Sequence, residues 1–293
     1  MIGTRSGILL VDKPQGLTSH DVVARTRKAA GTRKVGHAGT LDPMATGLLV
    51  LGLNSSTRLL TYLVGLDKEY FATIRLGVTT DSDDADGAVV STSSASAVTD
   101  AAIEAGVARL RGPISQVPST VSAIKVDGKR AYALAREGEE VVLKPRSVTI
   151  STFEVLARRG DEVDVRVECS SGTYIRALAR DLGADLGVGG HLTALRRTRI
   201  GPFGIDDAQV LEGIDVAGGL IAPAEAASAL FERVQLSEQQ ALELTQGKRF
   251  AVDAPDGSPV AAVTASGRLV GLVTIASGRV RALVNFPTDE ALA

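Results

Sequence analysis

One carboxylate, Asp42, stands in a segment that could hold an acidic side chain rigidly at a site. The apolar run at 48–51 follows it, and the neighbours that shape its backbone are Gly36, Gly39, Pro43 and Gly47. Glycines permit positive φ angles and the close approach of a ligand, while Pro43 biases Asp42 away from helical backbone. A carboxylate presented in this way could serve as a nucleophile, or act with His37 in a metal-dependent phosphodiesterase. An ordinary turn with a solvated aspartate has the same local composition.

Further motifs follow one another along the chain. They lie at 7–19 (a strand running into Lys13-Pro14), 68–77 (with Lys68-Glu69-Tyr70), 80–87 (an acidic loop), 116–132 (a basic segment), 169–176 (ending in Tyr174-Ile175-Arg176) and 191–198 (with Arg196-Arg197). Together with the Asp42 segment, and in this order, they resemble the motifs of the pseudouridine synthase B family. Members of that family isomerise a uridine in the T-loop of transfer RNA to pseudouridine. The tail after residue 230 matches the family less distinctly.

The resemblance implies roles for particular side chains. The catalytic residues would be Asp42, Tyr70 and Arg176. The residues that line the nucleotide pocket or fill the space left by the base would be His37, Tyr174 and Leu195, and those that grip the RNA stem-loop would be Lys125, Lys129 and Arg130. Taken singly, His37 would more often be a structural histidine, Tyr70 a core residue and Arg176 a surface charge.

The implied reaction breaks the N1–C1′ glycosidic bond, rotates the base and joins C5 to C1′. Nothing is oxidised or hydrolysed, so the resemblance implies neither a cofactor nor a metal. An ionised Asp42 would be the nucleophile, and Arg176 would hold its charge state and orientation. Attack on the sugar, attack on the pyrimidine ring and a glycal route are all open at this stage. The uridine must be flipped out of folded RNA, and Tyr70 would stack on the flipped base.

Charge is distributed unevenly along a chain whose net charge is only -2 at pH 7. Residues 1–60 and 105–204 each carry +5, whereas residues 61–104 and 205–293 each carry -6. A locally basic face can bind a polyanion even on a nearly neutral protein, which agrees with the T stem-loop of tRNA as the expected partner. The longest apolar run, near 47–53, is too short to span a bilayer. A single cysteine, Cys169, and the lack of a signal-like leader predict a cytoplasmic protein.

The sequence predicts an α+β fold with two domains. Residues 1–230 are expected to form a catalytic domain of the pseudouridine synthase type, with a mixed, largely antiparallel sheet and an RNA-gripping insertion at about 116–147. Residues 231–293 are expected to form a small β-barrel similar to the PUA-type RNA-binding domain. The hydrophobic pattern predicts strands at 7–11, 70–76, 141–143, 148–153, 163–167, 260–263, 269–275 and 280–284, a buried element at 48–53, and helices at 18–30, 99–110, 174–186 and 237–244.

Other chemistries find less support in the sequence. The acidic loop is a poor calcium site, because Ala85 and Thr92 stand where ligands are required. The three histidines and one cysteine show no metal-binding spacing, and the sequence contains neither an elbow-serine motif nor a P-loop motif. Two alternatives are kept: a non-catalytic tRNA-binding or tRNA-folding chaperone, and the metal-dependent phosphodiesterase. We expect a monomer that needs no obligate protein partner.

Overall fold

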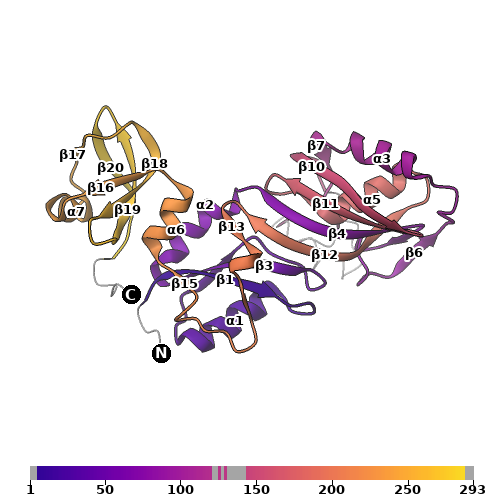
Figure 1. The fold of residues 1–293 in the computed structure, drawn as a ribbon, viewed down its shortest axis with the longest axis horizontal. Coiled ribbons are helices and arrows are strands. Elements are labelled where there is room, and N and C mark those ends of the chain that lie inside the picture. Colours follow the sequence, from indigo (N-terminus) through magenta and orange to yellow (C-terminus); the bar gives the residue numbers. More distant parts are fainter. Residues whose placement is uncertain (1–4, 121–124, 127–128, 131–142, 288–293) are drawn as a thin grey trace. The chain divides into compact units, whose positions relative to one another are not determined.

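The computed structural model describes residues 5–120, 125–126, 129–130 and 143–287, which Figure 1 shows as a ribbon with its elements labelled. The chain forms two compact units. The first comprises Met1–Leu41, Leu48–Val64 and Gly201–Ala293, and the second comprises Asp42–Gly47 and Gly65–Ile200. The domain boundary that the sequence predicts after residue 230 lies inside the first unit, and it stays a prediction.

The first unit is organised around strand β1 (Gly7–Lys13), a mostly buried segment that is apolar from Gly7 to Val11. β1 lies beside β3 (Thr46–Leu53), which pairs antiparallel with β2 (Val35–Ala38). β1 also pairs in parallel with β14 (Gln209–Val210) and antiparallel with β15 (Leu220–Ile221). This strand therefore takes partners from segments that lie far apart in the sequence.

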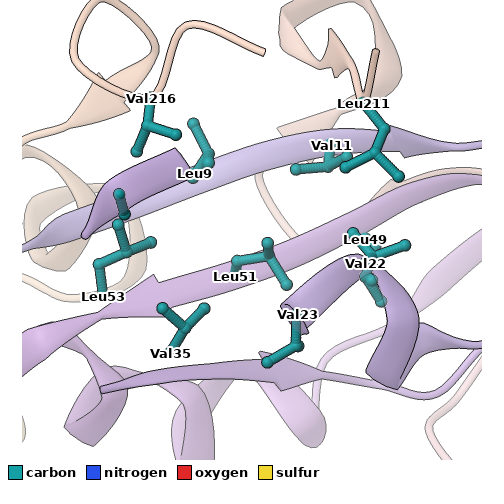
Figure 2. Packing of buried hydrophobic residues seen from close by; sticks show 11 residues of the cluster. Leu9, Val11, Val22, Val23, Val35, Leu49, Leu51, Leu53, Leu211 and Val216 are labelled. Carbon is teal, nitrogen blue, oxygen red and sulfur yellow. The ribbon is translucent and has the colours of Figure 1, made fainter. Parts of the chain in front are cut away.

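The core of this part lies between the strands and helix α1 (Ser19–Ala30), as Figure 2 shows. Val22 and Val23 of α1 belong to one cluster with Leu49 and Leu51 of β3. Its other large members are Leu9, Val11, Val35, Leu53, Leu211 and Val216. Each such side chain contributes about 1.5–3 kcal/mol when fully buried, so this cluster provides a stable base for the turn that follows β2.

Helix α1 begins where the sequence predicts, because its first turn is capped. The Thr18 side chain accepts a hydrogen bond from the Asp21 backbone N–H, and the Asp21 side chain accepts one from the Thr18 N–H. This reciprocal capping box satisfies two amide groups that the helix cannot satisfy itself. The helix ends at Gly31, which has the left-handed φ of 67°.

The last part of the first unit is a five-stranded sheet in the order β16–β18–β19–β20–β17. Its strands are β16 (Arg233–Leu236), β17 (Phe250–Ala251), β18 (Gly257–Thr264), β19 (Leu269–Ala276) and β20 (Arg279–Asn285). Helix α7 (Glu238–Thr245) packs on it through Ala241 and Leu244. The helix and the three long strands predicted for this part of the chain are confirmed.

The remaining elements of the first unit are short. They are η1 (Asn54–Leu59), α2 (Leu60–Val64), β13 (Phe203–Gly204), η2 (Ile205–Asp207) and α6 (Pro223–Leu230).

The second unit is built on an antiparallel run of strands in the order β12–β4–β11–β10–β7. These are β4 (Lys68–Leu76), β7 (Gly112–Gln116), β10 (Arg146–Arg159), β11 (Glu162–Cys169) and β12 (Gly190–Ile200). The first two residues of β3 pair in parallel with β12, so the sheet is mixed and largely antiparallel, as predicted. Helix α5 (Ile175–Asp185) packs on β12 and β4, and α3 (Asp100–Arg109) packs on β10 and contacts α5.

Two hairpins complete the second unit. β5 (Val78–Thr80) pairs with β6 (Val89–Thr92) around the acidic loop, and β8 (Lys125–Val126) pairs with β9 (Lys129–Arg130) in the predicted insertion. Residues 141 and 142 of the strand expected at 141–143 lie outside the described residues. Within the described ranges, no helix is both long and apolar enough to cross a membrane.

Candidate active site

Asp42 lies in a tight turn that is anchored on both sides. Its carbonyl oxygen accepts a hydrogen bond from the Ala45 N–H at 3.1 Å, with Pro43 in the position where a turn favours proline. The preceding residue, Leu41, is fixed by the Ser19 hydroxyl, which accepts from its N–H at 2.9 Å and donates to its carbonyl at 3.2 Å. Leu41, Met44 and Ala45 are buried, whereas the side chain of Asp42 is 39% exposed. The turn therefore presents a solvent-accessible carboxylate from a fixed backbone.

Gly47 fastens the end of this turn to strand β12. Its φ of 101° lies in the region that favours glycine, and a Cβ at this position would stand 2.2 Å from the carbonyl oxygen of Arg197. The two backbones approach so closely because Thr46 and Gly47 pair with Arg196 and Arg197. Any larger side chain would push the Asp42 turn away from β12.

The Asp42 carboxylate forms an ion pair with Arg176 in the first turn of α5. The Nη2 atom of Arg176 lies 2.9 Å from Oδ2 of Asp42, and its Nη1 atom lies 3.3 Å from Oδ2 of Asp84. Nη1 also donates to the carbonyl oxygen of Ser82 at 2.7 Å. The Arg176 side chain is only 3% exposed, so its charge depends on these acceptors. The planar guanidinium thereby orients the Asp42 carboxylate.

Asp84 is held in turn by the acidic loop. Its Oδ1 accepts from the Ser82 hydroxyl at 2.5 Å and from the Asp86 N–H at 3.1 Å, and its carbonyl oxygen accepts from the Thr80 hydroxyl at 2.7 Å. With 4% of its surface exposed, Asp84 is a buried partner of Arg176 and not a solvated loop residue. The loop that we considered as a calcium site in the sequence therefore binds the arginine that holds Asp42.

Tyr70 lies on the buried face of β4, opposite Arg197 of β12. Burial raises the pKa of the Tyr70 phenol, and the Arg197 guanidinium, which hydrogen-bonds to it, opposes that rise. The negative charge of Asp42 raises the same pKa, so the two side chains are near enough to interact. Leu195 lies on the same face of the sheet, because its strand partner, Ala72, is two residues from Tyr70. The second unit therefore contains four of the predicted site residues close together: Asp42, Tyr70, Arg176 and Leu195.

Lys68 is a buried cation on the same face of β4 as Tyr70. Burial, followed by the nearby Arg197 guanidinium, lowers the pKa of Lys68 to about 8. The Lys68 ammonium donates to the carbonyl oxygen of Leu66 at 2.7 Å. Cys169 of β11 is the residue that pairs with Lys68. Burial is the main cause that raises the pKa of its thiol to about 11, so the thiol is protonated at neutral pH.

For the other predicted substrate-binding residues, the structure gives contacts with neighbours other than Asp42. Tyr174, at the N-cap of α5, is bound through its backbone to Gln116, which donates to its carbonyl at 3.0 Å and accepts from its N–H at 2.8 Å. His37 belongs to the first unit, on β2, where its ring packs edge-on against His20 with the centroids 5.4 Å apart. The backbones of Lys125, Lys129 and Arg130 form the β8–β9 hairpin, and their side chains lie outside the described part of the structure.

Sequence reasoning assigned no role to Asp84, Arg197, Lys68 or Gln116. The acidic loop and the Arg196-Arg197 pair were visible as charge clusters, but such clusters are usually solvated. Their burial depends on the register between β4 and β12 and on the position of α5, neither of which local sequence reveals.

This arrangement suits chemistry at a single oriented carboxylate. Asp42 is partly exposed, is paired with a buried guanidinium, and lies near a tyrosine on the buried face of β4. A carboxylate in such surroundings can attack an electrophilic carbon of a bound substrate or stabilise positive charge on it.

Three family descriptions match consecutive parts of the chain. Residues 27–175 match "TruB family pseudouridylate synthase (N terminal domain)", residues 176–239 match "tRNA pseudouridylate synthase B C-terminal domain", and residues 231–287 match "tRNA Pseudouridine synthase II, C terminal".

Similar proteins cover nearly the whole chain. The tRNA pseudouridine synthase B of Leifsonia xyli subsp. xyli is 60% identical over 300 residues, covering 99% of each chain. The protein of the same name from Arthrobacter sp. is 56% identical and covers 97% of this chain and 98% of its own. Among solved structures, an H/ACA RNP bound to a substrate RNA containing 2'-deoxyuridine is similar with a TM-score of 0.72 and 26% identity, over 98% of this chain and 87% of that one.

Proposed function

This chain belongs to the TruB family of pseudouridylate synthases, and from that premise we propose that it converts uridine 55 in the T-loop of tRNA to pseudouridine. The isomerisation of a uridine in tRNA follows from the family and from relatives of 52–60% identity. The catalytic domain adopts the pseudouridine synthase fold, and the C-terminal sheet is PUA-like. The target position, the nucleophile and the lack of a cofactor are the parts that we add.

The proposed role of Asp42 as the nucleophile is supported by two ion pairs, which link Asp84 to Arg176 and Arg176 to Asp42. Arg176 keeps Asp42 ionised and fixes the direction of its oxygens, so that one of them can approach the sugar or the ring of a flipped uridine. Asp84 contacts the other terminal nitrogen of Arg176, so the guanidinium would stay in place while Asp42 reacts. Every proton and electron needed to break N1–C1′ and form C5–C1′ is already present in the uridine, so the reaction requires no cofactor.

Tyr70 is assigned to the flipped base. Its ring on the buried face of β4 would support stacking, a contact worth about 1–3 kcal/mol for a base on an aromatic ring. Because burial raises the pKa of Tyr70, its phenol is protonated at neutral pH, and it would assist removal of the C5 proton only with the Arg197 guanidinium beside it. Tyr174 and Leu195 would line the pocket, and His37 would fill the space that the base leaves.

Binding of the T stem-loop is assigned to the basic segments, with Lys125, Lys129 and Arg130 contacting phosphates. We further propose that the protein works in the cytoplasm as a monomer without an obligate protein partner.

One experiment tests this function against both alternatives. The purified chain is incubated with an unmodified tRNA transcript in excess EDTA, and pseudouridine is mapped by chemical labelling. We expect one modified position, uridine 55. RNA cleavage that stops in EDTA would instead identify a metal-dependent phosphodiesterase, and tRNA refolding without any pseudouridine would identify a chaperone.

The role of Asp42 is tested with Asp42→Asn, which should abolish product because an amide cannot replace the carboxylate, while tRNA affinity stays within about threefold. Asp161→Asn, on the exposed turn between β10 and β11, is the matched control and should keep wild-type turnover. Substantial turnover by Asp42→Asn would remove Asp42 as the nucleophile.

A further inference from the structure

Helix α5 carries two arginines on one face, and both bind the acidic loop. Arg176 and Arg180 are four residues apart, so their side chains leave the helix on the same side. Arg176 contacts Ser82 and Asp84, as described above. Arg180 pairs with the intervening residue, Asp83, with Nη1 3.2 Å from Oδ2. Three consecutive loop residues are therefore held by two neighbouring arginines.

Asp83 is rigidly placed within this loop. Its φ of 61° is left-handed, a conformation that aspartate and asparagine tolerate better than most residues. Its carbonyl oxygen accepts from the Leu192 N–H at 3.0 Å, and its side chain is 11% exposed. Because Asp83 precedes Asp84 directly, a shift of Asp83 moves the carboxylate that holds Arg176.

The other terminal nitrogen of Arg180 reaches a different segment of the chain. This atom, Nη2, donates to the carbonyl oxygen of Val117 at 2.7 Å, just after β7. Nearby, the Thr120 hydroxyl donates to the carbonyl oxygen of Asp81 at 3.2 Å, and Gln116 binds the backbone of Tyr174. Residues 116–120 are thus fastened to the acidic loop and to the start of α5. Arg180 also contacts its neighbour Asp181 at 2.9 Å, which helps to fix the plane of its guanidinium.

We propose that Arg180 is a positioning residue that couples the segment 117–120 to the Asp42–Arg176–Asp84 contacts. This inference rests on the proposed function, since the rate that it affects is that of pseudouridine formation. Segment 117–120 leads into the part of the chain that we assign to RNA binding. RNA that displaces this segment therefore acts, through Arg180 and Asp83, on the loop that sets the position of Arg176. An isolated surface ion pair would have no such effect on chemistry.

The test compares Arg180→Met with Arg109→Met. Arg109 forms an ion pair with Asp185 at the other end of α5, so this control removes an arginine contact from the same helix without touching the acidic loop. The readouts are the single-turnover rate at saturating enzyme, the Kd for tRNA and the midpoint of urea unfolding. We expect Arg180→Met to slow the single-turnover step about tenfold, the order of a typical coupling between sites, with Kd changed less than about threefold. Arg109→Met should keep the wild-type rate.

Two further variants test the contact between Arg180 and Asp83 independently of Arg180→Met. Arg180→Lys retains a charge for Asp83 but not the fork that also reaches Val117, and should recover part of the rate. Asp83→Asn tolerates the left-handed backbone and removes the same ion pair, so its rate should fall like that of Arg180→Met, and the double variant should be no slower than the slower single variant.

The proposal is overturned by an Arg180→Met rate within about twofold of wild type, by an equal slowing in Arg109→Met, or by additive effects in the double variant. If Arg180→Met fails to fold, Arg180→Lys and Asp83→Asn decide the matter by the same criteria. Wild-type protein that forms no pseudouridine would instead refute the proposed function, because every rate here is measured relative to that activity.

Discussion

The close approach of β3 and β12 at Gly47 allows a sharp test of how the Asp42 turn is positioned. In Gly47→Ala, the new Cβ would stand 2.2 Å from the carbonyl oxygen of Arg197, whereas ordinary van der Waals contact begins at 3.4 Å. The two backbones must therefore separate by about 1.2 Å, in addition to the strain of alanine at a φ of 101°.

The displacement should affect catalysis more than stability. A positive φ costs alanine about 1–3 kcal/mol, and overpacking adds about 1–3 kcal/mol that relaxation of the turn partly relieves. The turn that moves carries Asp42, and a misplacement of about 1 Å can reduce a rate about 100-fold. We therefore expect the single-turnover rate of Gly47→Ala to fall by about two orders of magnitude, with tRNA affinity changed only a few-fold.

Gly112→Ala is the matched control for backbone strain. Gly112 has a φ of 81°, but no atom lies within 4 Å of the Cβ that alanine would add. This variant should lose about 1 kcal/mol in urea unfolding and keep its rate. If Gly47→Ala and Gly112→Ala show the same rate, the close approach to Arg197 does not position Asp42, and the reasoning is refuted.

Three other predictions follow from the same site. Arg176→Lys should lower the turnover number about 10- to 100-fold, because an ammonium cannot satisfy Asp42, Asp84 and Ser82 together; near-normal turnover would return Arg176 to a purely structural role. The pKa of Lys68 is lowered from 10.5 to about 8, so between these two pH values the unfolded chain holds a proton that the folded chain has lost. The free energy of unfolding of wild type, relative to that of Lys68→Met, should therefore rise by up to about 3 kcal/mol from pH 8 to pH 10.5. A difference in urea unfolding that does not change with pH would contradict the lowered pKa. Replacing Lys125, Lys129 and Arg130 with alanine should reduce the slope of log K against log salt by about 0.7–0.9 for each phosphate that is no longer neutralised, whereas an unchanged slope would assign RNA binding to other residues.

Local sequence rules predicted the elements of this fold well. The capping residues Thr18 and Asp21 marked the start of α1, and the alternation from Tyr70 to Leu76 marked β4 with its buried face. Pro43 and the glycines around Asp42 indicated a turn that presents a carboxylate, and the structure places Asp42 in such a turn. These features are local, so neighbouring residues are sufficient to determine them.

The partners of Asp42 could not be predicted in the same way. From its place at the start of a helix, Arg176 would ordinarily be a surface charge, yet it is 3% exposed because the acidic loop covers it. Asp84 is buried by pairing with an arginine more than 90 residues away in the chain, and Arg197 by the register of β12 against β4. The resemblance to a known family suggested a catalytic role for Arg176, which stays a prediction, whereas the residues that hold its side chain in place depend on tertiary packing alone.

The pairing of β1 has a consequence for the synthesis of the protein. Its partners β14 and β15 are encoded about 200 residues later, and at a ribosomal rate of about 5–20 residues per second they emerge about 10–40 s after β1. Throughout that interval, one edge of an apolar strand is available for pairing with other nascent chains. A shortened chain that ends before Ile221 would leave this edge of β1 without its β15 partner, so a chain intended for expression should extend beyond that residue.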